Sequence, residues 1–358
     1  MTPSRPVLTV DLAALAANWR ALAARAAPAE CAAVVKADAY GIGLAPAARA
    51  LAAAGARTFF VAQPQEGAAL REALGPGPAI YVLDGFTPAD AAEFRAFALR
   101  PALCSLPQVA AWTAALPGAP AALHIETGIN RLALSADELD ALRADPPAGL
   151  AVDLVMSHLA RADEPDSGMN ARQRGAFAGR ATLIAPLAPG ARLSLAATGG
   201  ILLGAPYHFD LVRAGIGLYG GLPFADALSV VRLDAPLLQV REIAAGETVG
   251  YGASWTAPRP SRIGVVPLGY ADGFHRATRG ARLFLDGRPV PVIGRVSMDL
   301  LTLDLTGLPE PAPGTTLEVL GPNQSVDRLA ACAGTLGYEV LTGLGRRYLR
   351  TYLGDPAT

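Results

Sequence analysis

Lysine is almost absent from this sequence of 358 residues, because Lys36 is the one lysine among 30 basic residues and the others are arginine. A composition bias from lysine to arginine accounts for the missing lysines, but it would remove an exposed lysine first. Lys36 instead ends an apolar run, residues 32–36. A Schiff base with an aldehyde cofactor requires a primary amine, which a guanidinium cannot supply. Lys36 is therefore a candidate for covalent chemistry.

Cysteine is scarce as well, with three residues far apart in the chain, Cys31, Cys104 and Cys332. An odd number at such wide spacing argues against a disulfide framework and against a zinc site, so we expect no bound metal. The net charge is -1 and no long run of one sign occurs. This charge pattern disfavours nucleic acid and anionic membrane surfaces as partners.

Long uncharged segments are missing too. Asp11 interrupts the first apolar stretch, so the N-terminus does not match a signal peptide, and no uncharged run reaches the length that spans a bilayer. We therefore expect a cytoplasmic protein. Alanine inflates the apolar fraction of 52%, but this fraction still supports a sizeable core. The length of the chain is sufficient for a large barrel with an appended domain, or for two ordinary domains.

The first part of the chain alternates short apolar runs with alanine-rich helical segments. Residues 11–27 have the spacing of an amphipathic helix capped by Asp11, and residues 87–98 and 169–187 have the same period. Apolar runs typical of buried strands lie near residues 32–36, 57–62, 79–83, 101–105, 121–126, 151–157, 193–197 and 211–219. Eight such βα units favour an α/β fold in which residues 11–230 form a (β/α)8 barrel of the TIM type, rather than an open doubly wound sheet.

The composition changes near residue 230. Valine, threonine, leucine and proline become frequent, and short alternating runs predict strands. Asp286 and Gly287 predict a hairpin turn between strands at 282–285 and 290–293. We interpret residues 231–358 as a mostly β C-terminal domain, and we expect the strand-like segment 1–10 to join it.

Polar side chains follow several barrel strands at their carboxyl ends. For the first, fifth, sixth, seventh and eighth predicted strands, these are Lys36, Arg131, His158, Thr198 and Arg213. The carboxyl ends of barrel strands meet on one face, where the active site lies, and the last two loops often bind phosphate. The glycine-rich turns 198–200 and 215–217 follow those two strands, so their amides could approach a phosphate closely.

Each of these residues also has a purely structural explanation. His158 could be a core histidine with satisfied hydrogen bonds, the arginines could be ion-paired at the rim, and the glycines could relieve close packing. Their convergence on the rim that carries the only lysine favours a pyridoxal phosphate site instead. Such a site needs an amine, a phosphate pocket and charged groups for a substrate carboxylate.

Six segments carry a more specific pattern. In chain order they are residues 34–43 (VVKADAYGIG), 126–132 (ETGINRL), 212–220 (VRAGIGLYG), 250–255 (GYGASW), 268–273 (LGYADG) and 294–299 (GRVSMD). Together they resemble the motifs of the alanine racemase family, fold-type III pyridoxal-phosphate enzymes that interconvert L- and D-alanine, over essentially the whole chain. The resemblance implies a homodimer with shared active sites, and a role in supplying D-alanine to peptidoglycan or in D-alanine catabolism.

The resemblance also implies a two-base mechanism, because racemisation requires a base on each face of Cα. Lys36 would bind the cofactor as an imine and act on one face, while Tyr251 of the partner subunit would act on the other. Arg213 would face the pyridine nitrogen, where a fixed cation disfavours protonation. His158 would connect Tyr251 to Arg213 and help to activate the phenol.

The remaining site residues follow from the same resemblance. Arg131 would contact the substrate carboxylate and the cofactor phenolate, and Met298 would offer its backbone amide to that carboxylate. Phosphate would be bound by Tyr40, Thr198, Gly215, Ile216 and Tyr352. The substrate entrance would be lined by Asp163, Tyr270 and Arg276.

The sequence departs from the family pattern at two positions, and a third alignment is open. Where relatives often have a carbamylated lysine that orients the strand-five arginine, this chain has His124, so that arginine must be held by His124, by an anion or by another group. The Asn-Ser pair usual after the seventh strand is Ala197-Thr198 here. Near the C-terminus we align the phosphate tyrosine with Tyr352, and Tyr348 is the competing choice.

Three other functions share parts of this pattern. A racemase of the same fold could act on serine or another small amino acid, since pocket size depends on side chains that the sequence does not place. A decarboxylase of basic amino acids has a similar architecture, but with an acidic residue in place of Arg213. A pyridoxal-phosphate carrier would consist of the barrel alone and would not need a second base such as Tyr251.

Overall fold

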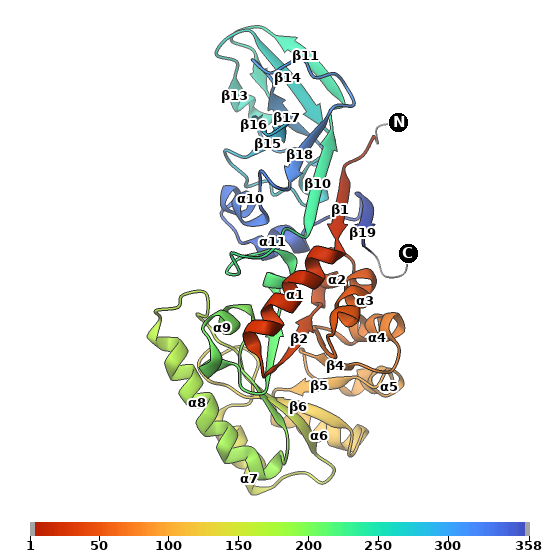
Figure 1. Ribbon diagram of the computed structural model, residues 1–358, viewed down its shortest axis with the longest axis vertical. Helices are drawn as coiled ribbons and strands as arrows, with labels where there is room; N and C mark the ends of the chain where they lie inside the picture. The colour runs from red at the N-terminus through yellow and green to blue at the C-terminus, as the bar shows by residue number, and fades with distance from the viewer. Residues whose placement is uncertain (1–3, 355–358) are drawn as a thin grey trace.

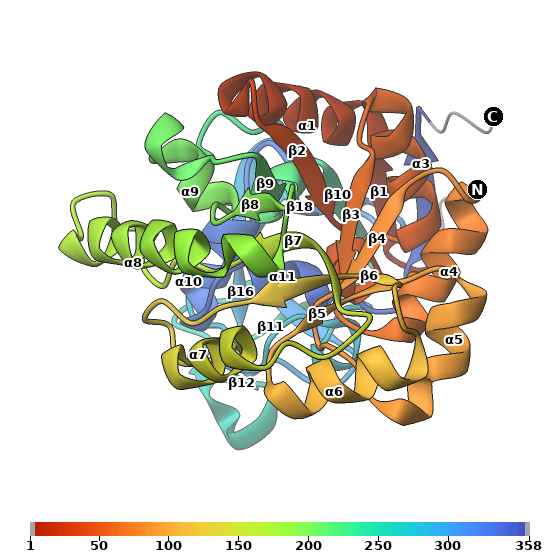
Figure 2. The same ribbon diagram turned by 90° about the horizontal axis from the view of Figure 1, so that it is seen from below.

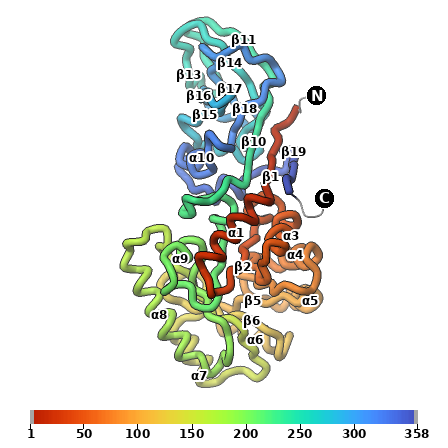
Figure 3. The backbone as a smooth tube through the Cα atoms, in the orientation of Figure 1, coloured from red at the N-terminus to blue at the C-terminus, as the bar shows by residue number. Residues whose placement is uncertain are grey.

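The computed structural model describes residues 4–354 and consists of a barrel and a β-rich part stacked along the long axis of the molecule (Figure 1). The two ends of the described chain lie on the same side of the molecule (Figure 3). Residues 1–3 and 355–358, which belong to the expected N-terminal strand and C-terminal domain, lie outside the described residues.

Within residues 4–354, eight parallel strands form the barrel. They are β2 (Glu30–Val34), β3 (Thr58–Val61), β4 (Ala79–Val82), β5 (Arg100–Leu103), β6 (Pro120–His124), β7 (Ala151–Met156), β8 (Arg192–Ser194) and β9 (Leu211–Ala214). From β2 to β8 each strand pairs with the next in sequence, and β9 pairs with β2. The backbone N–H of Arg213 donates to the carbonyl of Ala196, just after β8, at 2.9 Å, which closes the ring. The barrel prediction is confirmed.

Helices surround the strands on the outside (Figure 2). They are α1 (Leu12–Ala26), α3 (Leu44–Ala54), α4 (Pro64–Leu74), α5 (Ala91–Ala96), α6 (Leu106–Ala115), α7 (Ala136–Ala144), α8 (Gly168–Ile184) and the short α9 (Thr198–Leu202). The predicted cap of α1 is confirmed, because Oδ1 of Asp11 accepts the N–H of Ala14 at 2.9 Å. The helix predicted at 87–98 is shorter, since it begins as a 3₁₀ turn and Ala98 has a positive φ of 48°.

The barrel strands are apolar on both faces, because one face packs against the helices and the other fills the barrel. Phe60 and Tyr81 are fully buried on neighbouring strands, with stacked rings 5.1 Å apart. On α6, Trp112 packs edge to face against Phe86 and Phe94. Full burial of one such apolar side chain stabilises the fold by about 1.5–3 kcal/mol. The close packing of the barrel therefore fixes the positions of the strand ends.

The β-rich part contains a nine-stranded sheet within the described chain, in the order β11-β14-β17-β16-β15-β18-β10-β1-β19. Its strands are β1 (Val7–Asp11), β10 (Val231–Pro236), β11 (Gln239–Ile243), β14 (Ser261–Val266), β15 (Arg282–Leu285), β16 (Arg288–Ile293), β17 (Leu301–Asp304), β18 (Thr316–Leu320) and β19 (Leu349–Leu353). The same part holds the pair β12 (Thr248–Val249) and β13 (Trp255–Thr256), and the helices α10 (Val326–Ala333) and α11 (Gly337–Thr342). The hairpin predicted at Asp286-Gly287 is confirmed, with positive φ values of 49° and 77° that suit a type I′ turn.

The chain passes between the two parts after β1 and again between β9 and β10. β1 pairs antiparallel with β10 and parallel with β19, so the first and last strands lie in one sheet. Buried Asn18 on α1 donates to the carbonyls of Leu218 and Leu228, at 3.1 and 2.9 Å, in the segment between β9 and β10. These contacts fix the β-rich part against the barrel. Among the helices of residues 4–354, none is long and apolar enough to cross a membrane.

Candidate active site

A cavity of about 1090 Å³ opens at the carboxyl ends of the barrel strands. The sequence-predicted residues that line it are Lys36, Tyr40, Arg131, His158, Asp163, Thr198, Arg213, Gly215 and Ile216. They lie on or after β2, β6, β7, β8 and β9, so the parallel pairing of the strands brings together side chains that are far apart in the sequence. The volume is sufficient for a cofactor together with a small substrate.

Lys36 begins a left-handed helical turn, α2 (Lys36–Tyr40). Residues 37–40 all have φ between 52° and 55°, a conformation that costs an L-residue about 1–2 kcal/mol. The backbone is still hydrogen-bonded as a helix, since the N–H of Ala39 donates to the carbonyl of Val35 at 2.9 Å. Such strain persists only where surrounding contacts over-determine the conformation.

Aromatic stacking holds one side of this turn. Tyr40 is buried and its ring stacks on Tyr219, with 4.4 Å between the centroids. The hydroxyl of Tyr219 donates to the carbonyl of Val34 at 2.8 Å, at the end of β2. Tyr219 therefore fixes both the strand that leads to Lys36 and the turn that follows it.

The last strand of the chain holds the other side. From β19, Arg350 Nη1 donates to the carbonyl of Gly41 at 2.7 Å, and the Tyr352 hydroxyl donates to the carbonyl of Ile42 at 2.9 Å. The hydroxyl of Tyr348 donates instead to a carbonyl in the β-rich part. Tyr352 is thus the tyrosine that contacts the loop after Lys36, although neither tyrosine lines the cavity within the described residues.

The charge of Lys36 depends on its neighbours. Burial lowers the pKa of the Lys36 ammonium, and the Arg131 cation lowers it further. Asp84 and Glu66 act in the opposite direction, but the net change is downward. At a given pH, a larger fraction of Lys36 is therefore neutral than of a lysine exposed to water, and the neutral amine can act as a nucleophile or as a base.

Arg213 is buried, with 3% of its surface exposed, among acceptors of the protein. Its Nη1 donates to the carbonyl and the hydroxyl of Ser194 at 3.0 and 2.6 Å, and its Nη2 donates to the carbonyl of Ser157 at 2.6 Å. Nη2 also lies 3.3 Å from Nδ1 of His158. Burial and nearby Arg131 lower the pKa of Arg213 to about 9, so the guanidinium is still a cation at neutral pH.

The protonation of His158 follows from this contact. A guanidinium can only donate, so Nδ1 of His158 accepts from Arg213 and the proton of the neutral ring lies on Nε2. Burial and the Arg213 cation lower the pKa of His158 well below its usual value, which keeps the ring neutral. His158 therefore presents Nε2–H as a donor on the side away from Arg213.

His124, the last residue of β6, is 5% exposed, and both of its ring nitrogens lack a hydrogen-bond partner in residues 4–354. Burial, and then the cations Arg213 and Arg131, lower the pKa of His124 to about 3. Arg131 lines the same cavity, is exposed, and has no hydrogen bond or ion pair in that range. The structure thus brings His124 and Arg131 to one cavity without a bond between them.

The loops after β8 and β9 meet at Thr198. Its hydroxyl oxygen accepts the N–H of Gly215 at 3.0 Å and that of Gly217 at 3.3 Å. A Cβ at Gly215 would lie 2.8 Å from the hydroxyl oxygen of Tyr40, so only glycine permits this approach. The candidate phosphate residues of both loops therefore lie next to Tyr40.

Besides Tyr352, four predicted residues do not line the cavity of their own chain, namely Tyr251, Tyr270, Arg276 and Met298. All four are exposed on the β-rich part, and Tyr251 and Met298 have 68% and 53% of their surface exposed. The N–H of Ala271 donates to the carbonyl of Met298 at 2.9 Å, so the segments of Tyr270 and Met298 are adjacent.

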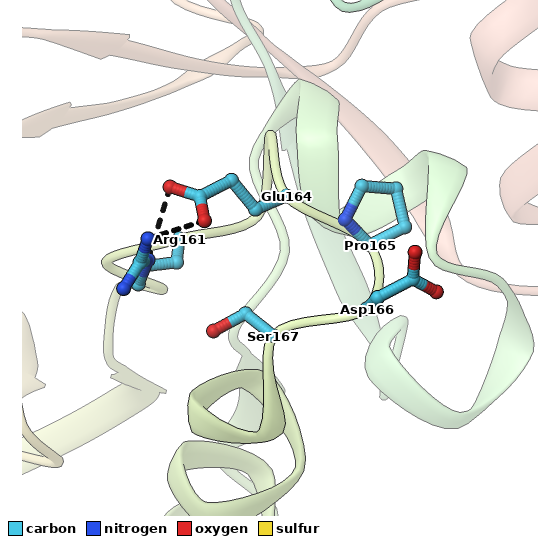
Figure 4. Close-up of a pocket in the computed structure, with 5 residues that line it drawn as sticks. All are labelled: Arg161, Glu164, Pro165, Asp166 and Ser167. Carbon is cyan, nitrogen blue, oxygen red and sulfur yellow. Dashed lines mark hydrogen bonds and ion pairs between the residues drawn. The ribbon is translucent and has the colours of Figure 1, made fainter.

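Asp163 lies in the loop before α8, which forms both a wall of the cavity and a smaller surface hollow. That hollow is lined by Arg161, Glu164, Pro165, Asp166 and Ser167 (Figure 4). Arg161 and Glu164 form an ion pair there, and Nδ2 of buried Asn170 donates to both of their carbonyls at 3.0 Å. These hydrogen bonds from Asn170 fix the loop on α8 and so hold Asp163 at the cavity.

The sequence analysis missed several residues of the site. Tyr338 on α11 lines the cavity, and its ring centroid lies 6.1 Å from that of Tyr40. Asp84, after β4, also lines it. Tyr219 lies inside the 212–220 motif and could have been found there, whereas nothing in the sequence marks Tyr338 as a neighbour of the barrel.

Comparison with known proteins decides the family. Residues 10–223 match the family described as "Alanine racemase, N-terminal domain", and residues 230–352 match "Alanine racemase, C-terminal domain". The chain belongs to the alanine racemase family.

Relatives within the family cover nearly the whole chain. The alanine racemase of Cereibacter sphaeroides is 51% identical over 351 residues, 96% of this chain and 97% of the relative. That of Rhodospirillum rubrum is 50% identical over 364 residues, 97% of this chain and 96% of the relative. Both alignments cover nearly the whole length of this chain and of the relative.

Solved structures agree with the fold. Alanine racemase from Bartonella henselae, with covalently bound pyridoxal phosphate, has a TM-score of 0.93 at 36% identity, covering 98% of this chain and 100% of that one. The biosynthetic alanine racemase from Pseudomonas aeruginosa has a TM-score of 0.88 at 36% identity, with the same coverage. The arrangement of barrel and β-rich part is therefore that of the alanine racemase family.

The neutral state of His124 predicts an acid-dependent loss of stability in the cofactor-free protein. An unfolded histidine binds a proton below about pH 6.5, whereas folded His124 stays neutral down to about pH 3. Acid therefore favours the unfolded chain, and the contribution of His124 is complete above pH 6.5 and falls as the pH drops towards 3. The slope from this one group is at most about 1.4 kcal/mol per pH unit. Urea unfolding at pH 7, 6 and 5 should give a shallower decline for His124→Gln than for the wild type, and equal slopes would contradict this assignment.

Proposed function

We propose that this chain interconverts L-alanine and D-alanine with pyridoxal phosphate as cofactor, using one base on each face of the substrate Cα. The observation that carries the proposal is the position of Lys36, the only lysine of the chain, in a cavity with the buried cation Arg213. When bound there, pyridoxal phosphate supplies the electron withdrawal that acidifies the Cα–H bond. The family membership and the covalently bound cofactor of the Bartonella relative support the same chemistry.

The residues around the cavity fit this cofactor. Lys36 supplies the amine, and the close approach of the loops after β8 and β9 gives a cradle that a Cβ at Gly215 would fill. The proposed phosphate residues are Tyr40, Thr198, Gly215, Ile216 and Tyr352. Cations in the cavity suit a ligand that carries a phosphate, together with a substrate that carries a carboxylate.

Arg213 would keep the pyridine nitrogen of the cofactor unprotonated. Both of its Nη atoms are bonded to acceptors of the protein, which leaves Nε–H as the donor for that nitrogen. A fixed cation opposes a second positive charge beside it. Arg213 thereby favours return of the proton to Cα, and so racemisation over transamination.

We propose that the substrate is bound by polar groups that form no hydrogen bond or ion pair within the described residues. Arg131 has no ion pair within the described chain, so its guanidinium is available for the substrate carboxylate and the cofactor phenolate. We propose that the backbone amide of Met298 of the partner subunit donates to the same carboxylate, since Met298 does not line the cavity of its own chain. Together they would orient Cα between the two bases, which is a precondition for proton transfer at both faces.

The second base would come from a homodimer. Tyr251 is 68% exposed and does not line the cavity of its own chain, and Tyr270 and Met298 are also exposed on the β-rich part. Exposed aromatic and methionine side chains are typical of interaction surfaces. We propose that Tyr251 of the partner subunit lies opposite Lys36 and accepts the Nε2–H of His158. The entrance would then be lined by Asp163, Tyr270 and Arg276.

Incubation of the cofactor-loaded protein with L-alanine in deuterium oxide tests the activity. Two-base racemisation places solvent deuterium at Cα while optical rotation is lost, and both follow in one sample by proton NMR and polarimetry. L-serine in a parallel sample measures how far the cavity accepts a larger side chain. Release of carbon dioxide, or the absence of Cα exchange, would falsify the proposed function.

Mixed dimers test the shared site. Lys36→Ala and Tyr251→Phe should each lose at least about a hundredfold in turnover, because each lacks one base, while Tyr251→Phe keeps the absorbance of the bound cofactor. After subunit exchange, a hybrid dimer has one intact site, so a random mixture should recover about a quarter of the wild-type activity. Unmixed variants treated identically are the control. No recovery after exchange verified by mass spectrometry would rule out a shared site.

A further inference from the structure

Glu66 connects the turn that begins at Lys36 to the neighbouring strand end. Its Oε1 accepts the N–H of Ala37 at 2.6 Å, and its Oε2 accepts the N–H groups of Ala62 and Gln63 at 2.8 and 3.2 Å. Ala37 is the first residue after Lys36, whereas Ala62 and Gln63 lie between β3 and α4. One carboxylate therefore spans the carboxyl ends of two adjacent barrel strands.

Both oxygens of Glu66 are required for this arrangement. Three N–H donors converge on the side chain, and a carboxylate satisfies them because it is an acceptor at both oxygens. An amide of the same shape would present an NH2 group to one of the two loops. Hydrogen bonds to a charged acceptor are also stronger than those to a neutral one. A carboxylate is therefore well suited to stabilise residues 37–40, because their left-handed conformation depends on contacts with the surrounding structure.

Glu66 also acts on the charge of Lys36. Asp84 and Glu66 are its anionic neighbours and Arg131 is its cationic neighbour, while His158 is neutral. Asp84 lines the cavity, but its carboxylate makes no hydrogen bond to the backbone of the turn within residues 4–354. Among these anions, Glu66 alone combines a negative charge with a bond to the turn.

We propose that Glu66 is a positioning residue for Lys36, because its carboxylate fastens the left-handed turn to the β3–α4 loop and so fixes the direction in which the amine enters the cavity. The inference rests on the proposed role of Lys36 as the cofactor amine. It can nevertheless be tested on backbone exchange and on Lys36 itself, without any measurement of turnover.

The single lysine makes the test direct. In full-length protein grown with lysine labelled with nitrogen-15 at Nζ, one side-chain signal reports the titration of Lys36 in the cofactor-free state. We expect a lower pKa of Lys36 in Glu66→Gln than in the wild type, since a negative neighbour is removed. We also expect the amide of Ala37 to exchange with solvent about tenfold faster, with and without bound cofactor, because one of its hydrogen bonds to a charged acceptor is weakened or lost.

Two control variants separate charge from attachment. Asp84→Asn should lower the pKa of Lys36 and leave exchange at Ala37 unchanged. Glu72→Gln, which alters an exposed carboxylate on the same helix α4, should change neither quantity.

The positioning role is overturned if Glu66→Gln matches Glu72→Gln in amide exchange at Ala37, whether or not the pKa of Lys36 moves. Should Glu66→Gln not fold, Glu66→Asp keeps the charge but is too short to span both loops, so it should still give faster exchange, and a wild-type rate would overturn the role. In the wild type, exchange of Ala37 at the rate of an unprotected amide would overturn it as well. A failed racemisation assay would refute the proposed function, but it would not change the measured amide exchange of Ala37 or the measured pKa of Lys36.

Discussion

The left-handed turn after Lys36 is the constraint on which the rest of the candidate site depends. Four consecutive residues without glycine, 37–40, lie in a backbone region that costs roughly 4–8 kcal/mol in all. Contacts from three directions offset this cost, namely stacking on Tyr219, the carboxylate of Glu66, and the hydrogen bond from Arg350. The amine therefore enters the cavity from a backbone that the whole fold holds in place.

This constraint explains why the barrel and the β-rich part act as one unit. β19 and α11 come from the end of the chain, yet they contact the turn and bring Tyr338 into the cavity beside Tyr40. The histidines of the cavity add no positive charge, because burial and the neighbouring cations keep the imidazoles of His124 and His158 neutral. The guanidinium groups of Arg131 and Arg213 suit an anionic cofactor and a substrate carboxylate, while the carboxylates Asp84, Asp163 and Asp327 also line the cavity.

Much of the fold could be predicted from the sequence. The barrel strands are buried on both faces, so each appears as a short apolar run, and the turn at Asp286-Gly287 has a local preference that the structure follows. The left-handed turn could not be predicted, because residues 37–40 have no local preference for it and distant residues impose it. Tyr338 was missed for the same reason, since its position depends on how α11 packs. The sequence left open whether His124, an anion or another group holds Arg131, and in the described residues His124 lines the same cavity but forms no hydrogen bond with it.

Borohydride reduction of the pyridoxal-phosphate-loaded protein, followed by peptide mass spectrometry, is the most direct measurement of the role of Lys36. Reduction converts a cofactor bound to an amine into a stable pyridoxyl adduct, and the sequence offers one lysine besides the N-terminal amine. We expect one adduct per chain on the peptide that contains Lys36, and none after Lys36→Arg. An adduct on the N-terminal amine alone, or a loaded protein with Lys36 unmodified after reduction, would contradict the assignment of Lys36 as the cofactor amine.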